Sequence, residues 1–245
     1  MAKKKAVALK TGVVRQSVAL TEATYDLSRD ERRVVYLAAI QCAQSDSGDQ
    51  QIFPITDYEI KCADYAAMFE VDAHESSRDV RLAIKSIYEK SVIIPDPDAS
   101  SDTEASIEEI RWIIGKKNLP RRGSWQITLN PLIVPHLTDL ANRIKYPIGQ
   151  IIYLQNTYQY RLYELFIAEP NGVREIEVDW LREKFCLNDK KSYQVYANLR
   201  QRIIDPAIKQ INETTPMKIS YIENKVNNKK VVSWTFTYSL PKTKK

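Results

Sequence analysis

The side chains best suited to molecular recognition lie on one predicted helix, residues 193–212. Its apolar side chains recur at helical spacing and should face the core: Leu199, Ile203, Ala207 and Ile211. Its polar face and the edge beside the apolar stripe carry a different set: Asn198, Arg200, Gln201 and Arg202. Asparagine, glutamine and arginine can each form two hydrogen bonds to a purine edge, so this face suits double-stranded DNA. A merely solvated polar face is the alternative interpretation.

Basic residues flank this helix on both sides. Lys190, Lys191 and Ser192 precede it, where DNA phosphates could meet the positive end of the helix. A predicted hairpin follows the helix and carries three lysines near its tip: Lys225, Lys229 and Lys230. The basic hairpin favours DNA binding over a solvated face.

A second predicted helix, residues 76–90, shows a weaker pattern of the same kind. Four side chains at its start and along one edge could contact DNA: Ser77, Arg78, Arg81 and Lys85. Glu75, Asp79 and Glu89 dilute the charge, so an ordinary charged helix is an equally good interpretation. Contacts from this helix would go to phosphates, which position a protein without specifying sequence.

The predicted elements that carry these residues follow the same order in both halves of the chain. In the first half the predicted helices cover residues 21–40, 63–69 and 76–90, and the predicted strands cover residues 92–94, 110–114 and 125–129. In the second half the predicted helices cover residues 158–168, 179–185 and 193–212, and the predicted strands cover residues 175–178, 217–222 and 231–238. A local similarity between residues 59–69 and 175–185 supports a repeated plan. Three helices followed by a β-hairpin form a winged helix, so the sequence predicts an α+β fold of two tandem winged-helix domains.

Prolines suggest where the domains meet, because Pro131, Pro135 and Pro147 bracket a connecting region. We expect a flexible basic arm over residues 1–16, a first domain over 17–135, a linker over 136–149, a second domain over 150–240 and a basic tail over 241–245. Residues 96–106 are rich in acidic side chains and should form a loop. Pro206 should kink the helix at 193–212, because it removes a backbone donor and clashes with the preceding turn.

Composition narrows the function. The 245 residues are 44% hydrophobic and carry a net charge of +5, which is typical of a globular protein with a mildly basic surface. Cys42, Cys62 and Cys186 lack disulfide or zinc spacing, and no stretch approaches the roughly 20 apolar residues that span a bilayer. Phosphate-binding glycine motifs are absent, and His74 and His136 form no paired metal motif. We therefore expect no catalytic residues, no metal, no cofactor and no membrane partner, in a cytoplasmic protein.

Four segments, taken in order, resemble a known family. They are LTEATYDLSRDERR at 20–33, RDVRLAIKS at 78–86, YRLYEL at 160–165 and QINETTPMKISYIE at 210–223. Together they resemble the iteron-binding plasmid replication initiators of the RepE and pi-protein type. The resemblance spans roughly residues 20–238.

The resemblance implies that the second domain reads a short repeated DNA element, the iteron. The first domain would contact the DNA backbone and form a homodimer. Monomers would open the bacterial plasmid origin and recruit host replication proteins such as the helicase and the host initiator. Dimers would repress the protein's own promoter at an operator inverted repeat. Gln201 interrupts the family's arginine-rich reading stretch at residues 199–203, so the iteron sequence can differ.

Two other functions fit the same residues. A winged-helix transcriptional regulator without a replication role would have the same fold and the same basic surfaces. A protein that keeps the winged-helix scaffold for interactions other than DNA binding would fit the moderate net charge, since fold alone does not determine function.

Overall fold

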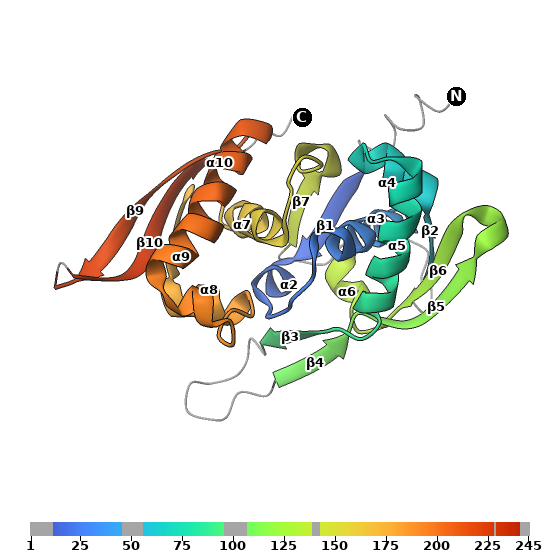
Figure 1. Ribbon diagram of the computed structural model, residues 1–245, viewed down its shortest axis with the longest axis horizontal. Coiled ribbons are helices and arrows are strands. Elements are labelled where there is room, and N and C mark those ends of the chain that lie inside the picture. Colours follow the sequence, from blue (N-terminus) through green and yellow to red (C-terminus); the bar gives the residue numbers. More distant parts are fainter. Residues whose placement is uncertain (1–11, 46–55, 96–106, 139–142, 228, 241–245) are drawn as a thin grey trace. The chain divides into compact units, whose positions relative to one another are not determined.

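The computed structural model describes residues 12–45, 56–95, 107–138, 143–227 and 229–240 (Figure 1). The chain divides into two compact units. Unit 1 contains Met1–Ala23 and Leu27–Ile152, and unit 2 contains Thr24–Asp26 and Tyr153–Lys245. The predicted acidic loop and basic tail, and residues 1–11 of the predicted arm, lie outside the described residues.

Helix α3 (Arg29–Ser45) forms the centre of unit 1, with the side chains of residues 31–40 all buried. A capping box starts it, as the sequence predicts: the Ser28 N–H donates to the Glu31 carboxylate at 2.6 Å, and the Glu31 N–H donates to Ser28 Oγ at 3.4 Å. Because this cap makes Arg29 the first residue of the helix, the helix predicted over residues 21–40 starts too early. A short helix, α2 (Val18–Glu22), precedes it instead.

The winged helix of unit 1 continues after α3. Its elements are β2 (Asp57–Lys61), α4 (Cys62–Phe69), α5 (Ala73–Ile87), β5 (Ile113–Leu119) and β6 (Ser124–Leu129). The three strands form an antiparallel sheet in the order β2-β6-β5. β5 and β6 form the wing of unit 1, which turns through the short helix η1 (Pro120–Arg122) and Gly123. Gly123 has a φ of +60°, a left-handed conformation that glycine adopts without strain.

A separate hairpin of β3 (Ser91–Pro95) and β4 (Ile107–Arg111) lies in sequence between α5 and the wing of unit 1. The strand predicted over residues 110–114 is therefore two strands, β4 and β5, separated by Trp112. Trp112 is buried, so the chain changes sheets at an anchored residue.

The described residues at 136–149 form no separate linker, where the sequence predicts one. This segment contains the end of α6 (Val134–Leu137), strand β7 (Arg143–Pro147) and most of η2 (Ile148–Gln150), all within unit 1. β7 pairs with β1 (Val13–Ser17), so the predicted arm at 1–16 also contributes a strand. Pro147 is tolerated because it ends an edge strand of a two-stranded sheet, where its missing N–H costs little.

Unit 2 has the second winged helix. Its elements are α7 (Thr157–Ala168), β8 (Val173–Glu177), α8 (Val178–Lys184), η3 (Lys191–Gln194), α9 (Tyr196–Leu199), η4 (Arg200–Ile204), α10 (Asp205–Thr214), β9 (Lys218–Val226) and β10 (Lys230–Ser239). The sheet order is β8-β10-β9, again antiparallel. Figure 1 shows β9 and β10 as a long hairpin extending away from the helices of this unit; this hairpin is the wing of unit 2.

The two units confirm the repeated plan. In each, the strand that precedes the second helix pairs with the last strand, which pairs in turn with the first wing strand. Ile60 of β2 and Ile176 of β8 occupy matching buried positions, and Phe69 and Phe185 are buried at the ends of α4 and α8. These are two of the three coincident pairs of segments 59–69 and 175–185, and the third is Glu59 with Glu175. The fold is α+β with two tandem winged helices, as predicted.

Candidate nucleic-acid interface

The helix of unit 2 that is predicted to read DNA, called the reading helix here, comprises α9, η4 and α10 and contains one wide turn. η4 is π-helical, and the Asp205 N–H donates to the carbonyl of Arg200, five residues earlier. Pro206 follows directly and has no N–H to donate. The sequence predicts a kink at this proline. The structure places a π turn there, and the helix continues to Thr214 with Leu199, Ile203, Ala207 and Ile211 buried as expected.

Gln201 and Arg202 project from this π turn and are exposed. Neither side chain forms a hydrogen bond or ion pair with any residue that the structure describes. Their donors and acceptors therefore face solvent, as those of a base-reading side chain must before DNA arrives.

Arg200 is engaged within unit 2. Its guanidinium lies 3.2 Å from a Glu223 carboxylate oxygen and 3.5 Å from an Asp205 carboxylate oxygen. The hydrogen bond to Glu223 is the main cause that raises the pKa of Arg200 above its ordinary value. The Tyr196 hydroxyl also donates to Glu223, at 2.7 Å, and together with Arg200 it lowers the pKa of that carboxyl.

Asn198 is also engaged within unit 2, since its side-chain amide donates to the Ser192 carbonyl at 2.8 Å. This bond joins the reading helix to η3, the short helix before it. Lys190 pairs with Asp26 at 3.6 Å, while Lys191 and Ser192 are exposed at the start of η3. The basic segment predicted before the helix is therefore present, and its Lys191 and Ser192 side chains are open to solvent.

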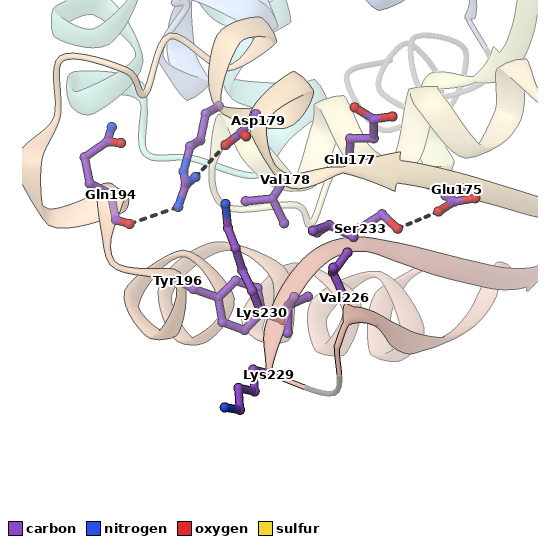
Figure 2. A pocket seen from close by; sticks show the side chains of 13 residues that line it. Glu175, Glu177, Val178, Asp179, Gln194, Tyr196, Val226, Lys229, Lys230 and Ser233 are labelled. Carbon is purple, nitrogen blue, oxygen red and sulfur yellow. Dashed lines mark hydrogen bonds and ion pairs between the residues drawn. The ribbon is translucent and has the colours of Figure 1, made fainter.

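The three predicted lysines of the wing of unit 2 are exposed. Lys225 lies 3.7 Å from a Glu223 carboxylate oxygen, and Lys229 and Lys230 border a pocket of about 920 Å³ between the wing, β8 and α8 (Figure 2). Figure 2 shows Lys230 extending into this pocket and Lys229 directed away from it. The acidic Glu175, Glu177 and Asp179 line the opposite side. Lys229 is the wing lysine best placed to meet a polyanion.

Arg182 supports the same region from inside the pocket. It pairs with Asp179 at 2.7 Å and donates to the backbone carbonyls of Tyr193 and Gln194 at 3.1 and 3.0 Å. These bonds fix the segment that leads into the reading helix. The predicted sites did not include Arg182, because the carbonyls that it holds lie eleven and twelve residues further along the chain.

In unit 1, the four predicted residues of α5 are all exposed: Ser77, Arg78, Arg81 and Lys85. Ser77, Arg78 and Arg81 line a groove of about 340 Å³ together with Asn118 and Trp125 of the wing. Arg78 pairs with Asp79 at 3.0 Å, and Ser77 Oγ donates to the Ala73 carbonyl at 3.3 Å. Arg81 and Lys85 make no such bond within the described part of the chain.

The turn of the same wing adds two basic residues that were not among the predicted contacts. Arg121 and Arg122 lie in η1 and are exposed. Basic residues at the tip of this hairpin were visible in the sequence, but their place beside the α5 groove depends on the pairing of β5 with β6.

The described residues hold no cluster of three or more histidine, cysteine or acidic side chains arranged to bind a metal ion. Among them, no helix is both long enough and apolar enough to cross a membrane.

The fold and the exposed basic helices define a protein with two tandem winged-helix domains. Residues 13–167 match the family model described as initiator replication protein, WH1, and residues 177–238 match the model described as initiator Rep protein, WH2. The chain therefore belongs to the initiator replication protein family.

Individual proteins are similar to this chain in sequence or in fold. An uncharacterized 27.6 kDa protein of Escherichia coli is 29% identical over 215 residues, which are 85% of this chain and 88% of that protein. A replication initiation protein of Escherichia coli is 26% identical over 98 residues, 38% of this chain and 31% of that protein. The crystal structure of the Pi initiator protein in complex with iteron DNA has the same fold, with a TM-score of 0.77, 16% identity and coverage of 96% of this chain and 99% of that one.

Proposed function

We propose that this protein is a plasmid replication initiator that binds double-stranded iteron repeats at the origin in a sequence-specific manner. The observation that carries the proposal is the π turn of the reading helix, which presents Gln201 and Arg202 exposed and without a hydrogen-bond or ion-pair partner among the described residues. Membership in the initiator replication protein family supports the origin as the target. The related fold was crystallised with iteron DNA, which supports the iteron as the repeat.

The contacts divide between the two units. In unit 2, Gln201 and Arg202 read base edges, while Lys190, Lys191, Ser192, Lys225, Lys229 and Lys230 contact phosphates. Asn198 and Arg200 are already bonded within the unit, so we assign direct contact to their neighbours. In unit 1, Ser77, Arg78, Arg81 and Lys85 hold the DNA backbone. This division makes unit 2 the source of specificity and unit 1 a source of affinity.

Family membership supports the finer steps of initiation, which belong to the same proposal. Monomers promote opening of the origin and recruit host replication proteins such as the helicase and the host initiator. Homodimers bind an operator inverted repeat and repress the protein's own promoter. These roles require binding and assembly rather than catalysis, and they place the protein in the bacterial cytoplasm.

The test is fluorescence anisotropy of the purified protein on a duplex from upstream of its own gene, beside a scrambled duplex, at low and near-physiological salt. A preference of roughly a thousandfold or more at the higher salt would establish a sequence-specific reader. Equal, salt-sensitive binding to both duplexes would contradict the proposal, because a basic surface alone gives that result.

A further inference from the structure

A group of polar side chains connects the reading helix to the wing of unit 2. Glu223, on wing strand β9, accepts from the Tyr196 hydroxyl at 2.7 Å and from Arg200 at 3.2 Å. The indole N–H of Trp234, on the neighbouring strand β10, donates to the Tyr196 hydroxyl at 3.0 Å. Glu223 and Trp234 are direct cross-strand partners. The group therefore stands on paired strands, which hold it in a fixed register.

The same group reaches the π turn. Arg200 begins that turn, and its guanidinium also lies 3.5 Å from Asp205, the residue that closes it. The Tyr221 hydroxyl, from β9, donates to the same Asp205 carboxylate. Side chains of the wing thus hold both ends of the turn, through Arg200 at one end and Asp205 at the other.

Gln201 and Arg202 lie between these two held ends. A π turn differs from an α-helical turn in the directions that its side chains take. A base-reading side chain loses its pairing geometry when its direction changes, because bidentate hydrogen bonds tolerate little displacement. Whatever fixes the π turn therefore fixes the readout.

We propose that Arg200 is a positioning residue whose clamp between Glu223 and Asp205 holds the π turn and so determines which DNA sequence Gln201 and Arg202 select. The inference rests on the proposed function and deepens it. It assigns sequence preference partly to Glu223, an acidic side chain that acts without contacting a base edge or a phosphate.

The charge of Glu223 makes the proposal testable. Removing an acidic residue near a DNA-binding face strengthens binding to every duplex if charge alone matters. The clamp requires the opposite result for the preferred sequence, because Glu223→Gln weakens the hold on Arg200. Arg200→Lys keeps the positive charge but loses the planar fork that reaches two carboxylates at once. A simple phosphate contact would survive that change.

The experiment uses the full chain and a duplex that the wild-type protein selects from a random-sequence pool, with a scrambled duplex beside it. Anisotropy gives the ratio of the two dissociation constants for wild type, Glu223→Gln, Arg200→Lys and Glu213→Gln. Glu213 is an exposed residue of α10, so its variant controls for the loss of one negative charge. The indole N–H resonance of Trp234 in a ¹H–¹⁵N spectrum reports on the clamp independently of DNA.

We expect Glu223→Gln and Arg200→Lys to lower the preference ratio by about tenfold or more, the effect of one mismatched base pair. Both should bind the scrambled duplex at least as tightly as wild type and shift the Trp234 resonance. Glu213→Gln should keep the full ratio. If Glu223→Gln unfolds, Tyr221→Phe takes its place, since it removes only the bond to Asp205.

If Glu223→Gln keeps the wild-type ratio of the two dissociation constants, the clamp is overturned while the proposed function stands. A wild type that selects no sequence from the pool would overturn the proposed function, and the clamp with it.

Discussion

The guanidinium carbon of Arg161 lies 4.1 Å from the ring centroid of Tyr25, across 136 residues of sequence. Arg161 also stacks on Phe185 at 4.4 Å, and it donates to the backbone carbonyls of Tyr25, at 3.0 Å, and Lys184. The side chain is buried within α7. Burying a cation is costly unless it gains hydrogen bonds and aromatic contacts, so these contacts make Arg161 an anchor of unit 2.

Arg161→Met should therefore destabilise the protein by about 2–4 kcal/mol, because it removes the hydrogen bonds from Arg161 to two backbone carbonyls and two cation–π contacts. Urea unfolding followed by circular dichroism measures the change. Arg202→Met, at an exposed position, is the matched control and should stay within about 0.5 kcal/mol of wild type. Similar losses in both variants would refute the anchoring role.

Arg202→Ala should weaken binding to the preferred duplex by about 1–3 kcal/mol and relax selection at one base position. The reason is that Arg202 is exposed on the π turn with no partner among the described residues. Anisotropy on the preferred duplex and on its single-base variants measures both effects. If binding to scrambled DNA falls by the same factor, Arg202 contacts a phosphate and reads no base.

Lys229→Ala should lower the affinity for every duplex and reduce the slope of log affinity against log salt by about 1. Lys229 is exposed on the wing and directed away from the acidic pocket, so it is free to displace a counterion from DNA (Figure 2). The measurement is a salt titration from low to physiological ionic strength. An unchanged slope would exclude Lys229 from the interface.

His136 should make the stability of unit 1 depend on pH. Ser17 Oγ lies 2.8 Å from His136 Nδ1, and burial lowers the pKa of His136 below its ordinary value of 6.5, against a weaker opposing effect of Glu108. The unfolded chain therefore binds this proton more readily than the folded one. The contribution of neutral His136 to the free energy of unfolding is complete above pH 6.5, and it is lost as the pH falls toward the lower pKa of the folded state.

Urea midpoints between about pH 5 and 8 measure this dependence. His136→Gln should flatten it in that range, whereas His74→Gln, at an exposed position of α5, should leave it as in wild type. Equal curves for wild type and His136→Gln would show that other groups cause the acid response.

Much of the fold follows from local sequence signals. The order of helices and wings, the buried stripe through Leu199 and Ile203, and the capping box at Ser28 and Glu31 all depend on residues a few positions apart, so the sequence predicts them correctly. Predictions were wrong where pairing between distant segments determines the local structure. The prolines around residues 136–149 resemble a linker, yet β7 gains its partner β1 about 130 residues away in sequence.

The candidate site divides in the same way. Residue types alone pointed to Gln201, Arg202 and the wing lysines, and the structure leaves these exposed. The role of Arg200 was not predictable, since Glu223 reaches it through the register of β9 with β10. Pro206 signalled a distortion, but its form as a π turn was not predictable, and neither was the hydrogen bond that Asp205 accepts from Tyr221 of the wing.

The interleaved connectivity of the two units limits how such chains can exchange parts. Thr24–Asp26 belongs to unit 2, although both neighbouring segments belong to unit 1. A recombination event that joins the first 152 residues of one initiator to the remainder of another would bring together a Tyr25 and an Arg161 of different ancestry. New DNA specificities should therefore arise more readily by substitution within residues 196–214 than by exchange of whole halves.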